Sequence, residues 1–561
     1  MKNSTVAHPY NYVAIGILMI PIAIFCFLIY TNSFNMISRD EYRIAGTFIK
    51  QFHQAATFQE YFSAFYIQEN ESRPIFVRIL YLLTYLIEGT YDFRTVCLFG
   101  NLELLTYILI LGLAFRSTGK SLLYFIPVPF ILLNLSPYFT FFFSYETYFY
   151  IASFFLPVTI FYTATMGKSK ITPYLLALLC IGVGSVTSVV TLLLISLRIL
   201  EKKYLSAFFF AVILVISILV IPKDGAGKDA GIISEILLNA RDLALLVFAL
   251  IGNFISVFSK NGTIIIGVGV LVSVSAFISI ITTFNWKNNY HRFLTISYLF
   301  FLVMLFFNCV RRWRQDYEGY LKEIVNGHKI IFSVAFLVIS YLICVEFFSA
   351  KKYLRRIHLA MMTLVAVALY LTANFNNISN VNLLQKRLHT DIANWELTNS
   401  HPNDIYGIYP YMTKNKLFTH GESFDQPLMN VIKQKLKDTT NLNRHYPFEV
   451  QLSKSNTKNT YGIQVTDFSI ECPSYPYPKS LDKTNGFYIL LVSKKRTVML
   501  PAMLNKLSVR KLLKTGNPYN NGLFCQSSNF EVASDNYKIA ICTVQNNQLV
   551  DFFFIDKQLA I

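Results

Sequence analysis

Residues 36–46 read MISRDEYRIAG, a stretch in which two adjacent acids, Asp40 and Glu41, lie between Arg39 and Arg43. A carboxylate within hydrogen-bond reach of a hydroxyl can remove its proton as the hydroxyl attacks an electrophile. The pair is therefore a candidate general base. For an isolated acid pair the favoured interpretation is a hydrated loop end with local pairing to Arg39 or Arg43, so the surroundings must supply the evidence for chemistry.

Three further polar stretches lie where apolar segments begin or end. They are ENESRP with Glu69, Glu71 and Arg73, SYETY with Tyr145 and Glu146, and RRWRQDYEGY with Arg311, Arg312, Arg314 and Tyr317. Arginine presents paired N–H donors that match phosphate oxygens. The simpler interpretations are a helix N-terminal charge at Glu146, favoured by the helix dipole, and lipid headgroup contacts for the late arginines.

The composition indicates the elements that must position these residues. Of 561 residues, 54% are hydrophobic and only 15% are charged, and mean hydropathy is +0.43. Soluble domains carry about 25% charged residues, so the chain is expected to be an integral membrane protein. Basic residues at the cytoplasmic ends of membrane spans account for the net charge of +18, and we expect no nucleic-acid partner.

A membrane span requires about 20 apolar residues. Clear candidates, beginning with an uncleaved first span, are 11–30, 95–115, 121–137, 148–166, 204–221, 263–284, 293–310, 329–349 and 359–373. The short loops 116–120, 167–170, 198–203, 286–292 and 349–358 carry two to four Lys or Arg each, and together only one acid, Glu201. The positive-inside rule makes these loops cytoplasmic and places 31–73 and 222–241 on the other side.

Loop parity then constrains three ambiguous apolar stretches. Residues 74–88 must start and end outside, as a juxtamembrane or half-inserted helix. Residues 172–198, with a GVGSVTS interruption, should form a broken pair, and 242–258 should lie along the outer face. Irregular backbone at membrane depth survives only where protein or a water-filled cavity satisfies it, so an internal cavity open to the outer side is expected.

From about Asn374 polar residues and turn formers dominate. Between them lie the short runs FEVQLS, YGIQVTDFSI, FYILLVS, KIAICTV and LVDFFFI, which predict strands of an extracytoplasmic α+β domain over 374–561. The remainder, 1–373, is the predicted transmembrane domain, with roughly 9–12 membrane segments and an outer loop over 31–94. On the outer side a Cys525–Cys542 disulfide is permitted, which leaves Cys472 odd.

The acid after the first span, the second acid at Glu146, the outer arginines and the terminal domain together resemble the GT-C class of integral membrane glycosyltransferases. The text of 73–109 is similar to the run that follows the first outer loop in that class, and 132–150 to its second-acid loop. The layout is similar to bacterial O-antigen-modifying glucosyltransferases and to aminoarabinose and protein mannosyl transferases. The usual pair of prolines is here Arg73-Pro74, and Glu146 replaces the more frequent Asp.

The resemblance implies a hexosyltransferase of the bacterial inner membrane with a periplasmic C-terminal domain. It would move one sugar from a polyprenyl phosphate to a hydroxyl of a cell-surface glycan such as O-antigen, by inverting displacement. Asp40 is the expected base and Glu41 the reserve, while Glu146 positions the acceptor or helps to hold a divalent cation. No cofactor is certain from the residues, and no ligand set stands out.

Under the same resemblance, Arg311, Arg312, Arg314 and Arg73 are assigned to the donor phosphate, and Tyr145 and Tyr317 to the acceptor. Membrane lipids complete the expected partners. Three alternatives stay open: a flippase or transporter for a lipid-linked glycan, an O-antigen polymerase, and a surface receptor that acts through its C-terminal domain. A transporter would place charges near the bilayer midplane, where Glu103 and Glu346 are the main exceptions to apolar spans.

Overall fold

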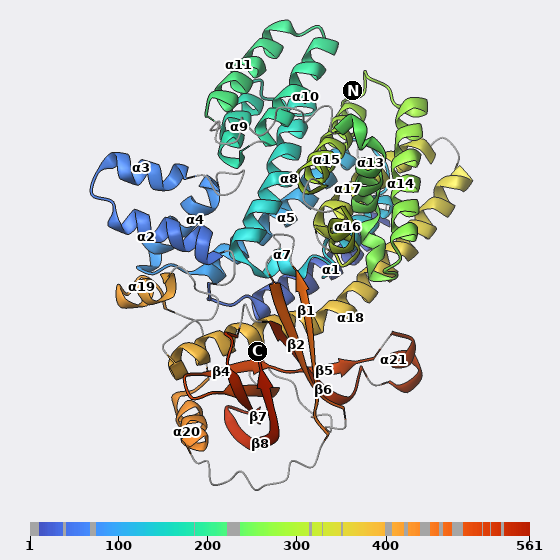
Figure 1. Ribbon diagram of the computed structural model, residues 1–561. Coiled ribbons are helices and arrows are strands. Elements are labelled where there is room, and N and C mark those ends of the chain that lie inside the picture. The colour runs from blue at the N-terminus through green and yellow to red at the C-terminus, as the bar shows by residue number, and fades with distance from the viewer. Residues whose placement is uncertain are drawn as a thin grey trace. The chain divides into compact units, whose positions relative to one another are not determined.

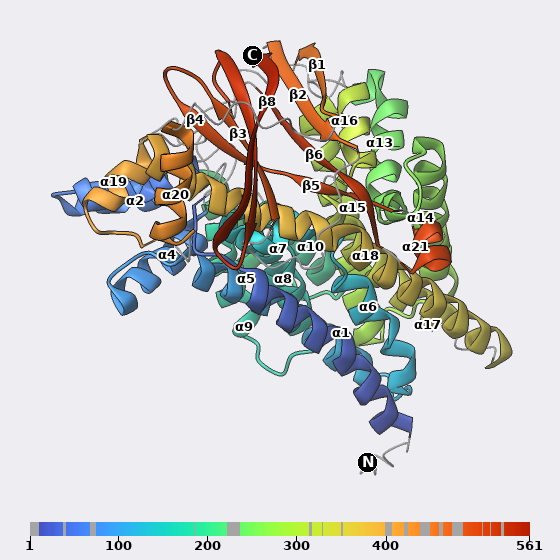
Figure 2. The same cartoon turned by 90° about the horizontal axis from the view of Figure 1, so that it is seen from below.

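The chain forms two compact units, each built from several chain segments. One unit contains 1–33, 57–80 and 95–377, and the other contains 34–56, 81–94 and 378–561. The computed structural model (Figures 1 and 2) describes residues 10–37, 41–67, 74–184, 186–220, 236–313, 317–327, 329–348, 352–398, 407–419, 424–437, 449–458, 464–473, 486–507, 509–516, 518–528 and 532–561.

The first unit is a bundle of apolar helices. Within the described residues, seven helices are long and apolar enough to cross a membrane, which confirms a multi-pass α-helical membrane protein. These candidate spans are Asn11–Asn32, Phe93–Arg116, Ala240–Val257, Gly262–Thr283, Asn289–Val310, Ile330–Phe347 and Tyr353–Leu397. They lie in α1 (Tyr10–Asn32), α5 (Phe93–Arg116), α13 (Ala240–Gly252) with η4 (Asn253–Val257), α14 (Gly262–Thr283), α15 (Asn289–Trp313), α17 (Ile330–Phe347) and α18 (Lys352–Thr398).

The other helices of this unit are α3 (Phe58–Tyr66), η2 (Leu122–Phe125), α6 (Pro127–Leu132), α7 (Tyr138–Phe142), α8 (Ser144–Thr165), α9 (Thr172–Cys180), η3 (Ile181–Val183), α10 (Val186–Leu200), α11 (Tyr204–Val220) and α16 (Tyr317–Val325). Helix α4 (Ile75–Glu88) begins in this unit, and its residues from 81 on belong to the second unit. The predicted break within 172–198 is confirmed, because α9 and η3 end at Gly184, whose φ of 92° favours glycine.

Two sequence expectations differ from the structure. The apolar stretch 121–137 was expected to be one span, but its helix ends at Leu132, and buried Asn134 donates a hydrogen bond back to the carbonyl of Ile131. The stretch 242–258 was expected along the outer face, yet α13 and η4 together are long enough to cross. The α13 and α14 backbones meet closely, since a Cβ added at either Gly252 or Gly269 would overlap the other helix.

Helix α4 was expected to be a short juxtamembrane helix, and it is a helix of 14 residues, too short to span. Its buried Arg78 donates hydrogen bonds of 2.7 Å to the carbonyl oxygens of Phe65, in the last turn of α3, and Ile67, just after it. These bonds satisfy carbonyls at the C-terminal end of α3, where intrahelical donors run out. Arg78 therefore has a structural role.

Side chains from two of the predicted cytoplasmic loops meet around Glu346 near the end of α17. Lys120, from 116–120, forms a salt bridge with its carboxylate, and His291, from 286–292, approaches to 3.4 Å. Glu346 itself lies just before 349–358. A charge near the end of a span is thus satisfied locally, and these basic loops share one end of the bundle.

A second cluster forms around Glu201. Its carboxylate pairs with Arg198, Lys203 and Arg292, so the loops 198–203 and 286–292 lie together. Burial would raise the pKa of Glu201, but hydrogen bonds from Lys203 and Arg198 and the nearby charge of Arg292 hold that pKa below its usual value. The guanidinium of Arg198 also donates to the carbonyl of Ala164, at the end of α8.

The second unit is built around two antiparallel four-stranded sheets, in the orders β1-β2-β6-β5 and β4-β3-β7-β8. The strands are β1 (Gln451–Lys458), β2 (Gln464–Cys472), β3 (Gly486–Val492), β4 (Thr497–Pro501), β5 (Met503–Lys506), β6 (Tyr519–Ser528), β7 (Asn536–Gln545) and β8 (Gln548–Ala560). The five short runs predicted as strands overlap β1, β2, β3, β7 and β8, although FEVQLS begins before β1 and the first three residues of YGIQVTDFSI lie outside the described residues. The β7–β8 hairpin turns at Asn546-Asn547, both with positive φ, as a two-residue turn requires.

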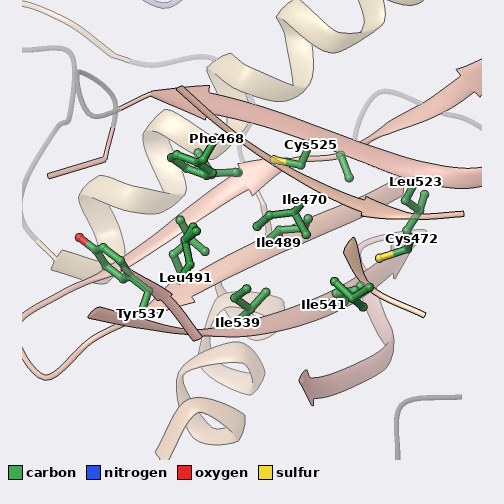
Figure 3. Packing of buried hydrophobic residues seen from close by; sticks show 14 of the residues in the cluster. Phe468, Ile470, Cys472, Ile489, Leu491, Leu523, Cys525, Tyr537, Ile539 and Ile541 are labelled. Carbon is green, nitrogen blue, oxygen red and sulfur yellow. The ribbon is translucent and has the colours of Figure 1, made fainter. Parts of the chain in front are cut away.

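Strand β3 is buried on both faces. Phe487, Ile489 and Leu491 belong to a core between the two sheets. Figure 3 shows Ile489 and Leu491 in this core with Ile470 from β2 and Ile539 from β7. The alternate residues of β3 face the part of α18 after 377 and α20 (Gln426–Lys437), which supply the helical side of a second core. The other helices of this unit are η1 (Tyr42–Gly46), α2 (Thr47–Gln54), α19 (Ile408–Lys414) and α21 (Val509–Thr515).

The Cys525–Cys542 disulfide that the sequence permits is not formed in the structure. Cys525 faces the core between the sheets, whereas Cys542 points to the opposite face of its sheet, toward α18 and α20. Side chains on opposite faces of a strand layer cannot reach one another. Cys472, the cysteine expected to be odd, is also a free buried thiol in the first of these cores.

Candidate functional site

Glu41 is the described member of the acid pair, and it is buried, with only 3% of its surface exposed. It immediately precedes η1, a π-helical turn over Tyr42–Gly46 that continues directly into α2. Such turns are rare and occur frequently at functional sites. A fully buried carboxylate at such a turn does not fit a hydrated loop end. Asp40, the preferred base from the sequence, lies outside the described residues.

The segment that carries Glu41 packs tightly against α19. A Cβ added at Gly46 would overlap Cγ2 of Ile408 and lie 2.9 Å from its Cγ1. Ile408 is itself 2% exposed, and its branched side chain has few alternative rotamers. Glycine at position 46 is therefore required for the close approach of these two helices.

The side-chain amide of Asn35, near the beginning of the same segment, forms hydrogen bonds through both its nitrogen and its oxygen. Its Nδ2 donates to the carbonyl of Thr419 at 2.9 Å, and its Oδ1 accepts from the N–H of Phe93 at 2.8 Å. The N–H of Tyr91 donates to the carbonyl of Leu417 at 2.8 Å. Three chain segments, 34–56, 81–94 and 407–419, are thus joined by hydrogen bonds. We call this arrangement the acid-loop clamp.

His53, at the end of α2, adds a further contact between segments 34–56 and 81–94 of the clamp. Its Nε2 lies 2.9 Å from the hydroxyl of Tyr91, and its ring packs edge-on against Tyr85. Burial lowers the pKa of His53, because the charged ring would lose hydration. Lys50 lies over the ring of Tyr411 at 5.8 Å. The clamp therefore holds α2 through hydrogen-bonded and aromatic contacts along its length.

The second predicted acid lies in the helical unit. Glu146 is half-buried in the first turn of α8, next to Tyr145, which is 7% exposed. The turn before α8 is fixed from α5, since Asn101 Nδ2 and Cys97 Sγ both donate to the carbonyl of Phe141 at 2.9 Å. Glu146 and Tyr145 thus begin a helix whose entry is held by a buried polar network.

The predicted phosphate-binding arginines are less completely described. Arg311 and Arg312 belong to the last turn of α15, and their side chains lie outside the described residues, as do Arg314 and Arg73 entirely. Tyr317 begins α16 and is half-buried. Burial raises the pKa of its hydroxyl, with Asp242 raising it further and Arg241 opposing this, so these charges lie near its ring. Their assignment to donor and acceptor stays a prediction.

The predicted residues fall into both compact units. Glu41 belongs to the unit with the C-terminal strands, whereas Tyr145, Glu146, Arg311, Arg312 and Tyr317 belong to the helical unit. The sequence reasoning missed a set of buried polar residues on α18, and they are Gln385, Lys386, His389, Thr390 and Asn394. Their spacing of one helical turn was a detectable signal for one polar helix face directed inward.

Part of this α18 face contacts the acid-bearing segment. The ring of His389 lies 4.6 Å from Phe34 and 6.1 Å from Phe424. The side-chain amide of Asn394 bonds both the N–H and the carbonyl of Met499, at 2.6 and 3.0 Å, and so covers the outer edge of β4. The face therefore connects the acid-loop clamp to the edge of a sheet.

Compared with known protein families, curated proteins and solved structures, the chain matches none. Within the described residues no three His, Cys, Asp or Glu side chains form a group suited to a metal ion.

Proposed function

We propose that this chain is a GT-C-like membrane glycosyltransferase. It moves a single hexose from a polyprenyl phosphate to a hydroxyl acceptor, a cell-surface glycan such as O-antigen, on the outer face of a bacterial inner membrane. The observation that carries the proposal is the burial of Glu41 at a π-helical turn soon after the first membrane span. The multi-pass helical fold supports the proposal, because the donor is a lipid.

The reaction proposed is one inverting displacement. A carboxylate of the Asp40–Glu41 pair accepts the proton of the acceptor hydroxyl as its oxygen attacks the anomeric carbon, and the bond to the lipid phosphate breaks. Negative charge then develops on the leaving phosphate oxygen, where Arg311, Arg312, Arg314 or Arg73 would stabilise it. Glu146, with Tyr145 and Tyr317, would position the acceptor or help to hold a divalent cation.

The test compares Asp40→Asn and Glu41→Gln with Glu88→Gln, an exposed acid of the same outer loop. Membranes carrying each variant are supplied with radiolabelled polyprenyl-phosphate hexose, and transfer to endogenous glycans is measured. Loss of the general base should reduce transfer by about 10²- to 10⁴-fold, while Glu88→Gln leaves it unchanged. Near-normal transfer by both acid variants would refute the assignment.

A flippase for a lipid-linked glycan is the second candidate, and one observation favours it. Glu103 lies within the α5 span, and its Oε2 is buried with no hydrogen-bond partner in the described part of the chain. Charged or ionisable groups inside spans often mark transport pathways. Glu346, the other exception noted in the sequence, is satisfied by Lys120 and needs no such role. A Glu103→Gln variant that blocks lipid translocation in proteoliposomes, with no sugar transfer by the wild type, would favour the flippase.

A further inference from the structure

Lys386 is a buried lysine on α18 in the C-terminal unit. It is 7% exposed, although lysine is almost never buried without a counter-charge. Among the residues that the structure describes, none forms a salt bridge or hydrogen bond with its ammonium. The ammonium lies 5.9 Å from the centroid of the Tyr488 ring. Within the described parts of the chain, the buried charge therefore has no anionic partner.

The backbone beside Lys386 is shaped around its ammonium. A Cβ added at Gly486, the first residue of β3, would overlap Nζ and lie 3.1 Å from Cε. Gly486 also has a φ of 157°, a backbone angle that residues with a side chain rarely adopt. The lysine stem thus lies directly over the glycine backbone, and position 486 tolerates no side chain while the ammonium is in place.

We propose that Lys386, over Gly486, is a binding site for a single oxyanion, either a carboxylate or a phosphate group carried by a ligand. A buried ammonium costs free energy when it is alone and recovers it when a charge-assisted hydrogen bond forms. The site is independent of the proposed sugar transfer, because it involves neither acid of the first loop. Phosphate groups and the carboxylates of acidic sugars both present an oxyanion to the ammonium, and the experiment distinguishes between them.

The first measurement is the rate at which acetic anhydride acetylates Lys386 in the detergent-solubilised full chain, followed by peptide mass spectrometry. Inorganic phosphate and glucuronate are the two probes, each compared with chloride at equal ionic strength. At a probe concentration ten times its Kd, protection should be about tenfold by mass action. The exposed Lys494 is the internal control and should react at an unchanged rate. Protection by one probe alone identifies the group, and protection by neither overturns the site.

The second measurement is thermal unfolding of Lys386→Met, which keeps the length of the side chain without its charge. If the ammonium awaits a ligand, this variant should unfold at a Tm equal to or higher than that of the wild type. The protecting probe should raise the wild-type Tm by about 3 to 6 °C and leave the variant unchanged. Gly486→Ala, which displaces the ammonium, should also lose the response to the probe.

The competing explanation is a counter-charge supplied by the chain itself. Asp482, outside the described residues, is the nearest acid in sequence to Gly486. If Asp482→Asn lowers Tm, and if Lys386 in that variant reacts faster with acetic anhydride in chloride alone, the lysine is paired internally and the proposal fails. If Asp482→Asn behaves as the wild type, the site is open to a ligand.

Discussion

Gly46 offers a direct test of the acid-loop clamp, because its role is steric. In Gly46→Ala the new methyl group would overlap Cγ2 of Ile408 and lie 2.9 and 3.0 Å from its Cγ1 and Cβ. Carbon atoms at rest lie about 3.5–4.0 Å apart, so either the helices separate or Ile408 leaves its rotamer. Both responses disturb the turn that begins beside Glu41.

The magnitude can be worked from two opposing effects. Overpacking of a buried site costs about 1–3 kcal/mol, and the close contacts with three atoms of Ile408 put this site in the upper part of that range, at about 2–3 kcal/mol. Replacing a helical glycine with alanine returns up to about 1 kcal/mol, because alanine loses less backbone entropy. The net expectation is a local destabilisation of about 1–2 kcal/mol, which corresponds to a five- to thirtyfold increase in the population of the open clamp.

Hydrogen exchange of the full-length protein measures this opening directly. Amides of α2 should exchange about five to thirty times faster in Gly46→Ala, while those of the β3–β7 core keep the wild-type rate. Gly16→Ala is the matched control, since it lies in α1 and a Cβ there meets nothing within 4 Å. Ile408→Ala in the same chain should remove most of the additional effect of Gly46→Ala, with a coupling of about 1–2 kcal/mol.

An unchanged α2 exchange rate in Gly46→Ala would show that the clamp tolerates a side chain at this position. The close contact would then have no role in fixing the acid-bearing turn. If Gly46→Ala had the same effect with and without the Ile408→Ala substitution, the cost would lie elsewhere, in the π-helical turn itself.

Three other predictions concern separate parts of the chain. Asn394→Ala should speed exchange at Met499 by about five- to a hundredfold, since both edge groups lose a buried partner worth about 1–3 kcal/mol. The pKa of His53 is lowered, so its stabilisation is complete above pH 6.5 and is lost as pH falls toward the folded pKa. The protection factors of the α2 amides, which correct for the slower intrinsic exchange at low pH, should therefore decrease on acidification in the wild type but not in His53→Gln. The pKa of Glu201 is also lowered, so its pairing with Arg292 stabilises above about pH 4.5 and is lost as pH falls below it; Tm should drop less steeply with acid in Glu201→Gln.

Local patterns predicted much of the fold. The five short runs predicted as strands all overlap strands of the structure. The alternation of side chains between the two faces of a strand depends only on residues that are neighbours in sequence, so a local pattern can reveal it. The break near Gly184 was equally visible, since glycine clusters interrupt helices. The strands β4, β5 and β6 were missed: their residues TVMLP, MLNK and YNNGLFCQSS gave no run that we recognised as a strand.

Long-range partners could not be predicted in the same way. Asn35 bonds Thr419, 384 residues later, and nothing in either local sequence indicates the other. The α13–α14 contact through Gly252 and Gly269 depends likewise on two helices meeting, and a sequence read one span at a time treats each glycine as neutral. The burial of Glu41 follows from such contacts, so the sequence could indicate an acid but not its environment.

The clamp also decides which experiment can separate a transferase from a receptor. Deleting the polar C-terminal region was the natural test from sequence, since a transferase would keep donor binding. That deletion removes Ile408 and Thr419, which contact the Glu41 segment at Gly46 and Asn35, and it would disrupt the acid-bearing turn in either case. Glu41→Gln in the intact chain replaces one carboxylate oxygen with an NH2 group and leaves those contacts in place. A transferase should then lose sugar transfer while retaining its lipid donor, and a receptor should be indifferent to the change.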